Sequence, residues 1–189
     1  MKLAQSLALA ALAAGCATPA HRALPLARGV EFDLLSPARF GRSVALDQVV
    51  RFSSAQGERR MHCALEIEPT ELRLVALTPF ETPAFFATFG GESLTLESAL
   101  GETLPADPRL ILADLQFALW PAVPAPRSCE VRERVEGQAW TRELVRDGRV
   151  LVRVRRPVGE PWASPLVYEH LERGYVLTVE TLRCETLAP

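Results

Sequence analysis

The chain has 189 residues, of which 48% are hydrophobic and 23% charged, and its formal net charge is −2. This mildly acidic mixture of charges gives no reason to expect a nucleic-acid partner or strong electrostatic binding to anionic lipid. The length is that of one domain with a sizeable hydrophobic core.

The N-terminal residues are typical of an export signal. Lys2 precedes a run of mostly Leu and Ala from Leu3 to Ala14, which is too short to span a bilayer as a helix of roughly 20 residues. A charged start, a short apolar run and a small-residue cleavage site predict a secretory signal peptide over residues 1–15. The sequence from Leu12 to Cys16, Leu-Ala-Ala-Gly-Cys, resembles a bacterial lipobox. This resemblance implies cleavage before Cys16 and lipidation of its thiol, and the alternative is an ordinary secretory signal that contains a cysteine.

The predicted anchor favours the outer membrane. Several acyl chains, at about 0.8 kcal/mol per buried methylene, hold a protein stably at a membrane where one chain would be marginal. An Asp after the lipidated cysteine would indicate retention in the inner membrane, so Ala17 favours the periplasmic face of the outer membrane. Residues 16–30 contain Pro19, Pro25 and Gly29 and are predicted to form a lipidated, flexible tether.

The folded domain is predicted over residues 31–189. Residues 31–43 fit either a short helix or a docking segment, and period-two alternation, typical of half-buried strands, begins after them. In residues 59–68, for example, apolar side chains occupy every second position. The strands predicted for this half of the chain are residues 45–53, 59–68, 71–78, 83–90 and 92–98.

A predicted helix over residues 108–119 interrupts the strands at the middle of the chain. Asp107 can cap this helix and Pro108 suits its first position. Pro121 ends it. The apolar side chains cover most of the helix circumference, so the helix should be well buried. These side chains are Leu110, Ile111, Leu115, Phe117 and Leu119.

Strands resume after the helix and complete one sheet. They are predicted over residues 129–135, 138–145, 148–156, 165–171 and 174–183. About ten strands in one antiparallel sheet must curl to bury a face. We therefore predict a mainly β fold, in which a single antiparallel sheet of about 10–11 strands curls into an open half-barrel. The mid-chain helix is expected to lid the concave face.

Such a half-barrel can enclose an apolar cavity that binds a ligand. The alternative is that the same side chains form a closed core without a ligand, which is the usual role of apolar strand faces. The side chains predicted to line the cavity are Leu65, Ile67, Leu74, Phe85, Leu115, Val152 and Leu177.

Of the four cysteines, three remain if Cys16 is lipidated. Cys63 shares a predicted strand face with Met61, which favours an inert buried thiol. Cys129 and Cys184 lie near predicted strand ends and are the more plausible pair for a disulfide, which the periplasm permits. No two cysteines have the spacing of metal ligands and the three histidines are scattered, so neither a metal site nor another cofactor is expected.

The sequence favours a binding protein over an enzyme. His21, His62 and His170 are candidate bases, but no Gly-x-Ser-x-Gly elbow accompanies them. A solvated or core histidine explains His62 and His170 more simply, so no catalytic residue is predicted. The serines that could have served as nucleophiles are Ser36, Ser53, Ser128 and Ser164.

The segment from Leu112 to Pro121, together with Gln48, Leu77–Phe80 and Arg173–Tyr175, resembles the signature of a bacterial lipoprotein family of unknown function. Members of that family often accompany the enzymes of aryl-polyene biosynthesis. The predicted architecture is also similar to the LolA/LolB lipoprotein carriers. Those carriers have an open half-barrel, lidded by helices, with a hydrophobic cavity for acyl chains.

These resemblances imply an outer-membrane lipoprotein that binds or accepts a hydrophobic lipid or acylated cargo, as part of aryl-polyene lipid transport. We expect a monomer, with the membrane contacted through the lipid anchor and a periplasmic carrier protein as a candidate partner. The alternative function is a non-enzymatic envelope scaffold that has a closed core and a protein partner.

The resemblance to LolB also assigns a role to Phe80. LolB has a loop between two early strands, with the pattern Pro-Leu-Gly, whose protruding apolar residue helps deliver cargo to the membrane. The corresponding residues here are Pro79, Phe80 and Glu81, so Phe80 is predicted to insert into the membrane. Glu81 departs from the Gly of that pattern. The departure argues against acyl-chain delivery, because a carboxylate beside the tip is costly to bury in lipid. The alternative is that Phe80 is a core aromatic beneath its own hairpin.

Overall fold

The structure, a computed structural model, describes residues 23–98 and 108–187. Ten strands form one antiparallel sheet, and two further strands form a separate hairpin. The predicted signal peptide and the lipidation site Cys16 lie outside the described residues. Within the described residues, no helix is long and apolar enough to cross a membrane.

The elements follow the predicted order closely. The hairpin consists of β1 (Ala23–Ala27) and β2 (Val30–Asp33). The first half of the large sheet consists of β3 (Val44–Ser54), β4 (Gly57–Ile67), β5 (Leu72–Leu77), β6 (Pro83–Phe89) and β7 (Leu94–Ser98). The second half consists of β8 (Glu130–Glu136), β9 (Ala139–Arg146), β10 (Arg149–Pro157), β11 (Leu166–His170) and β12 (Tyr175–Thr186). The helices are the short 3₁₀ helix η1 (Pro37–Phe40) and α1 (Pro108–Leu119).

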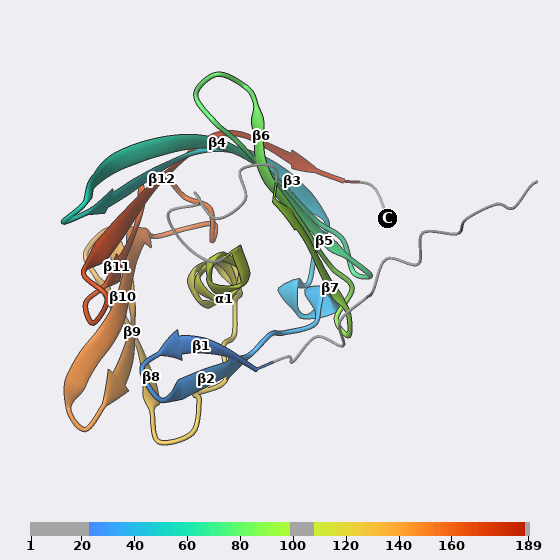
Figure 1. Ribbon diagram of the computed structural model, residues 1–189. Coiled ribbons are helices and arrows are strands. Elements are labelled where there is room, and N and C mark those ends of the chain that lie inside the picture. The colour runs from blue at the N-terminus through green and yellow to red at the C-terminus, as the bar shows by residue number, and fades with distance from the viewer. Residues whose placement is uncertain (1–22, 99–107, 188–189) are drawn as a thin grey trace, which may run out of the picture.

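The predicted fold class is confirmed. The strand order in the sheet is β7-β6-β5-β4-β3-β12-β11-β10-β9-β8, so two antiparallel meanders are joined where β3 pairs with β12. Figure 1 shows the sheet curling around α1 without closing on itself, since its two edge strands, β7 and β8, do not pair. The result is an open half-barrel with the helix on its concave side.

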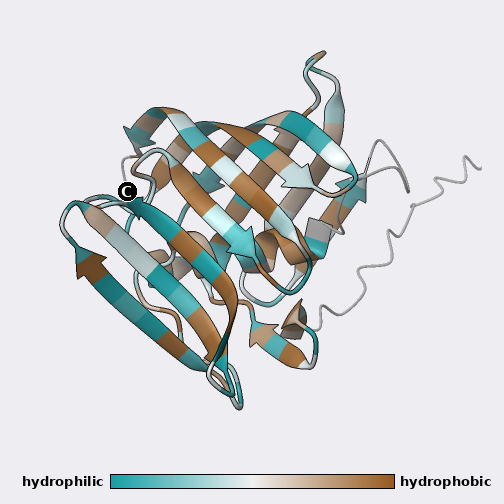
Figure 2. Cartoon of the chain, turned by 90° about the vertical axis from the view of Figure 1, so that its left-hand side faces the viewer, coloured by the Kyte–Doolittle hydropathy of each residue, from teal (hydrophilic) through white to brown (hydrophobic). Residues whose placement is uncertain are grey.

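Alternation along the strands places the core inside the curl. On β4, for example, Cys63 and Leu65 are buried, whereas Ala64 and Glu66 are exposed. In Figure 2 the same alternation of apolar and polar residues is visible along the strands of the sheet. The Asp147-Gly148 turn between β9 and β10 has both residues at positive φ, which suits a two-residue hairpin loop.

The predicted tether is wrong from Ala23 onward. Residues 23–33 form the β1–β2 hairpin, and its side chains Leu26 and Phe32 are fully buried. The hairpin lies on the open side of the half-barrel, below α1 in Figure 1. The Arg146 guanidinium holds it in place by donating to the carbonyl oxygen of Arg28 at 2.8 Å. The folded domain therefore begins earlier than the period-two pattern indicates, because these two strands are too short to establish a period.

The predicted pairing of Cys129 with Cys184 is also wrong, since Cys63, Cys129 and Cys184 are all free thiols. Cys129 immediately precedes β8 and Cys184 lies in β12, with β9, β10 and β11 between these two strands in the sheet. A disulfide needs Cα atoms within roughly 7 Å. Adjacent strands are about 4.8 Å apart, so two cysteines with three strands between them are too far apart to bond.

Helix α1 is held inside the curl by a buried arginine on β9. Arg142 is 1% exposed, and its Nη1 donates to the carbonyl oxygens of Phe117 and Trp120 at 2.7 and 2.8 Å. Its Nη2 donates to the carbonyl oxygen of Pro121 at 3.1 Å. The last carbonyls of a helix lack partners within the helix and favour a nearby positive charge. Arg142 therefore satisfies the C-terminal end of α1 where water is excluded.

A second polar contact joins α1 to the segment that follows the hairpin. Gln116 is fully buried, and its Oε1 accepts from the Leu35 backbone N–H at 2.6 Å. Its Nε2 donates to the Leu35 carbonyl oxygen at 2.9 Å. Because both ends of the amide have partners, Gln116 can be buried at little cost. It connects the N-terminal segment to the helix.

We expect Arg142→Met to destabilise the protein by about 3–5 kcal/mol, because it leaves buried helix carbonyls without donors and removes the partner of Glu133. The free energy of unfolding in urea measures the effect. Arg149→Met, at the exposed start of β10, is the matched control and should change stability by less than about 0.5 kcal/mol. Equal effects of the two substitutions would contradict the capping role.

Candidate functional site

An apolar cavity of about 80 Å³ lies between α1 and the inner face of the sheet. Strands β3, β4, β5, β6, β11 and β12 supply one wall. The other wall is a single face of the helix, because its residues recur at spacings of three and four. They are Ile111, Asp114, Leu115, Ala118 and Leu119.

Four of the seven predicted cavity residues line this space: Leu74, Phe85, Leu115 and Leu177. The other three, Leu65, Ile67 and Val152, do not line it; they are fully buried in the hydrophobic core. Their assignment to the cavity is therefore wrong, although their assignment to the interior is correct. Period-two alternation identifies the inner face of a strand, but it does not show which part of that face the helix leaves uncovered.

The size of the cavity limits what it holds as it stands. Ligand sites for small molecules usually measure roughly 300–1,000 Å³, and an engineered cavity of about 150 Å³ binds benzene. The present cavity, at about 80 Å³, admits a few water molecules or a short stretch of a single acyl chain. A longer chain needs α1 to move away from the strands.

Asp114 places a carboxyl group on the cavity wall, and two tyrosines bind it. The Tyr168 hydroxyl donates to Oδ1 and the Tyr175 hydroxyl donates to Oδ2. Burial raises the pKa of Asp114 to about 6, an effect that the two tyrosine hydrogen bonds and the nearby Arg173 oppose. Because Tyr168 is on β11 and Tyr175 begins β12, this cluster ties α1 to the second half of the sheet.

Sequence patterns alone missed Asp114, Tyr168 and Tyr175. One signal was available, because Asp114 falls at helical spacing between Ile111 and Leu115, on the apolar stripe of the helix. A carboxyl group in such a stripe needs buried partners. Nothing in the local sequence indicates that those partners come from β11 and β12.

Cys63 also lines the cavity, and burial raises the pKa of its thiol to about 12. The prediction that this thiol is buried is therefore confirmed. Such a thiol is protonated near neutral pH and reacts slowly.

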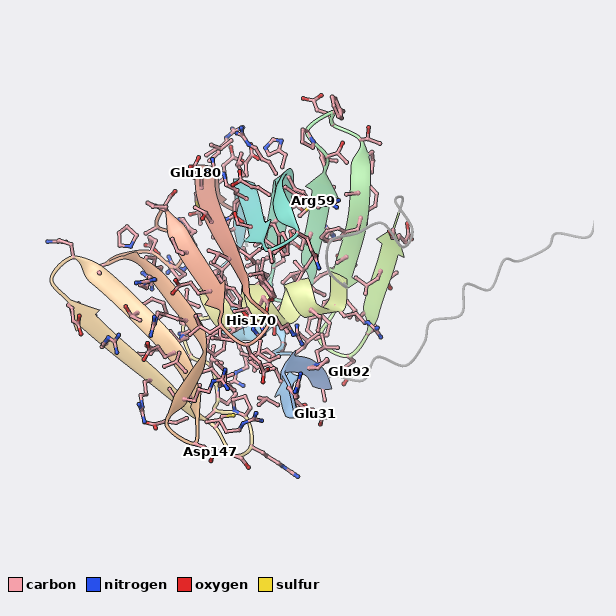
Figure 3. All side chains as sticks on the ribbon, turned by 60° about the vertical axis from the view of Figure 1, so that its left-hand side comes forward. Glu31, Arg59, Glu92, Asp147, His170 and Glu180 are labelled. Carbon is pink, nitrogen blue, oxygen red and sulfur yellow. The ribbon has the colours of Figure 1, made fainter. Side chains whose placement is uncertain are left out.

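The candidate bases lie apart and have structural partners. Figure 3 shows His170 near the middle of the molecule, whereas Asp147 and Glu180 lie at its periphery. His170 is fully buried; its Nε2 donates to the carbonyl oxygen of Leu26 at 2.7 Å, and its Nδ1 accepts from the Arg173 backbone N–H at 3.2 Å. It therefore anchors the β1–β2 hairpin.

His62 lies on the outer face of the sheet, half exposed and paired with Asp47. The third histidine, His21, lies outside the described residues. In residues 23–98 and 108–187, no three His, Cys, Asp or Glu side chains gather as metal ligands would.

The loop between β5 and β6 presents Phe80 to solvent. The side chain is 90% exposed, so the alternative of a core aromatic is wrong. The loop is ordered by hydrogen bonds from the Thr78 N–H to the Thr82 carbonyl oxygen and from the Glu81 N–H to the Thr78 carbonyl oxygen, both at 2.9 Å. Glu81 has a φ of 58°, a left-handed conformation that favours glycine.

The raised pKa of Asp114 predicts a specific pH dependence of stability. The folded pKa of about 6 lies above the value of 3.8 expected for an ordinary aspartate, so the folded protein holds the proton more tightly than the unfolded chain. This stabilisation is complete below about pH 4 and is lost as the pH rises through about 6. Asp114→Asn stays neutral and can still bond both tyrosines. Relative to this variant, the free energy of unfolding of the wild type should fall by up to about 3 kcal/mol as the pH rises from about 4 to above 6.

Urea unfolding of both proteins between about pH 4 and 7 measures this difference. Asp33→Asn, at an exposed aspartate of β2, is the control for removing a carboxylate. Parallel stability curves for the wild type and Asp114→Asn would show that the carboxyl group is not desolvated as its burial indicates.

Comparison with known proteins identifies a family but no activity. The family described as "Protein of unknown function (DUF3261)" matches residues 45–183. A search of curated proteins gave no match. A crystal structure of a proposed outer membrane lipoprotein-sorting protein domain from Vibrio parahaemolyticus is similar, with 9% sequence identity and a TM-score of 0.43. That similarity covers 77% of this chain and 85% of the other chain.

Proposed function

This chain belongs to the DUF3261 family of proteins of unknown function, and we propose that it binds a hydrophobic lipid or acyl chain between α1 and the half-barrel. The single observation that carries the proposal is the apolar cavity, which separates one face of a buried helix from the strands around it. Natural cores are close-packed, with few voids larger than a water molecule. A cavity between the helix and the strands therefore favours a ligand site over a closed core.

The contacts of α1 support a proposed route by which the site enlarges. Arg142 and Gln116 fasten the helix near its C-terminal end. At the middle of the helix, Asp114 and its two tyrosines form a polar tie between the cavity face and the sheet. An outward movement of α1 that breaks the hydrogen bonds of Asp114 would lengthen the cavity enough for an acyl chain.

The proposed setting is the bacterial envelope. The lipobox-like sequence ending at Cys16 supports a lipid anchor at the periplasmic face of the outer membrane. Phe80, at the tip of its ordered loop, would enter the membrane surface and allow cargo to pass between the cavity and the bilayer. An aryl-polyene lipid, brought by a periplasmic carrier protein, is the cargo that the sequence resemblances imply. The role is one of binding, without catalysis.

Filling the cavity should block ligand binding. Ala118 lines the cavity from α1, so Ala118→Leu adds side-chain volume where a ligand would lie. We expect the affinity for a fluorescent fatty acid to fall at least about tenfold, because the leucine side chain and the acyl chain would compete for the same volume and overpacking is unfavourable. Fluorescence titration of the domain carrying Cys16→Ser, which lacks its own acyl chains, measures the change.

Ala64→Leu, on the exposed face of β4, is the matched control and should bind as the wild type does. If the wild type binds no fatty acid and purifies without lipid, the binding function fails, and a scaffold that recruits a protein partner becomes the better proposal.

The membrane role of Phe80 can be measured separately. In the Cys16→Ser background, Phe80→Ser should weaken sedimentation with vesicles of phosphatidylethanolamine and phosphatidylglycerol by about tenfold, because an exposed phenyl ring contributes roughly 1.5–3 kcal/mol when buried in lipid. Fatty-acid binding should be unchanged. Phe86→Ser, at the exposed phenylalanine of β6, is the control, and equal losses for both variants would argue against a specific role for the loop.

A further inference from the structure

We infer that the cavity selects apolar chains that carry a hydroxyl group, and that Gln48 recognises this hydroxyl. The inference rests on the proposed function and adds the chemical class of the ligand. Gln48 lies on β3, is 3% exposed and lines the cavity. A primary amide at such a site costs free energy unless its polar atoms have partners.

The hydrogen bonds of Thr181 fix the orientation of this amide. The Thr181 hydroxyl donates its only proton to the Trp162 carbonyl oxygen at 3.0 Å. Towards Gln48, the Thr181 oxygen can then only accept. The group at 3.1 Å from it is therefore the Nε2 donor of Gln48, and the amide oxygen Oε1 is the atom left to face the cavity.

No donor among the described residues reaches this Oε1 atom. The carboxyl group on the cavity wall, Asp114, differs in this respect, since each of its oxygens receives a tyrosine hydroxyl. The Asp114 cluster is thus complete without a ligand. Gln48 thus gives the cavity wall an amide acceptor without a protein donor, amid apolar side chains such as Val50 and Leu74.

The missing partner must donate a hydrogen bond and still belong to an apolar chain. A cavity of about 80 Å³ has room for a water molecule that satisfies Oε1 while the site is empty. A plain acyl chain would displace that water and leave Oε1 unpaired, whereas a chain hydroxyl would replace it. An ammonium group would also donate, but its charge would have to be desolvated among apolar side chains. A hydroxylated acyl chain fits the site best.

The test compares octadecanoic acid with a set of hydroxyoctadecanoic acids that differ in the position of the hydroxyl group. Each competes with a fluorescent fatty acid for the Cys16→Ser protein. We expect at least one hydroxy acid to bind about tenfold more tightly than the unsubstituted acid, because a site built around a buried polar group rejects a ligand that leaves it unpaired.

Gln48→Leu replaces the amide with an apolar side chain of similar size. It should abolish the preference by weakening binding of the favoured hydroxy acid, while the unsubstituted acid binds at least as well as before. Gln138→Leu, in the exposed turn between β8 and β9, is the matched control and should keep the full preference. The wild-type comparison alone decides whether the hydroxyl preference exists. If Gln48→Leu does not fold, Gln48→Met tests the role of the amide in its place.

The outcomes separate this inference from the proposed function. If every acid binds the wild type with the same affinity, the cavity binds acyl chains but the hydroxyl preference is overturned. The same conclusion follows if a preference exists and Gln48→Leu retains it. If no acid binds, the proposed function fails and this inference fails with it.

Discussion

The burial of α1 inside the curled sheet is the constraint on which the rest of the structure depends. A helix surrounded by strands has no water to satisfy its terminal carbonyls, so the protein must supply a donor. Arg142 on β9 meets this need with hydrogen bonds to the carbonyl oxygens of Phe117, Trp120 and Pro121. The guanidinium also pairs with Glu133, so its own charge is compensated. Helix and second meander are thereby fixed as one unit.

The cavity follows from the unequal way in which the helix is held. Phe117 and Trp120, whose carbonyl oxygens accept hydrogen bonds from Arg142, pack into the core with Leu112. The opposite face meets β3 to β6, β11 and β12 across the cavity, and Asp114 ties it to the sheet through two tyrosine hydroxyls. An apolar helix in a half-barrel thus performs two tasks. One face completes the core, while the other forms the wall of a space that a lipid chain could enlarge.

The polar groups on the cavity wall have different roles. Asp114 is costly to bury, and its two tyrosines offset that cost while joining three elements. Gln48 is held by Thr181 in one orientation and keeps an acceptor facing the cavity. A half-barrel that only stored apolar chains would need neither group. Their arrangement favours a site that distinguishes among ligands by more than hydrophobicity.

The sequence by itself determined the elements of this protein, because hydrophobic period and helix-ending residues act locally. Strands β3 to β12 and helix α1 lie within a few residues of their predicted positions. Only the tertiary structure decided which strands meet. The pairing of β3 with β12 joins residues more than a hundred positions apart. The β1–β2 hairpin is too short to show a period, and the separation of Cys129 from Cys184 depends on strand order.

The residues of the candidate site were likewise determined in part by the sequence and in part by the tertiary structure. Alternation places Leu65, Leu74 and Val152 on the inner face, but only packing against α1 decides that Leu74 lines the cavity while Leu65 and Val152 lie in the closed core.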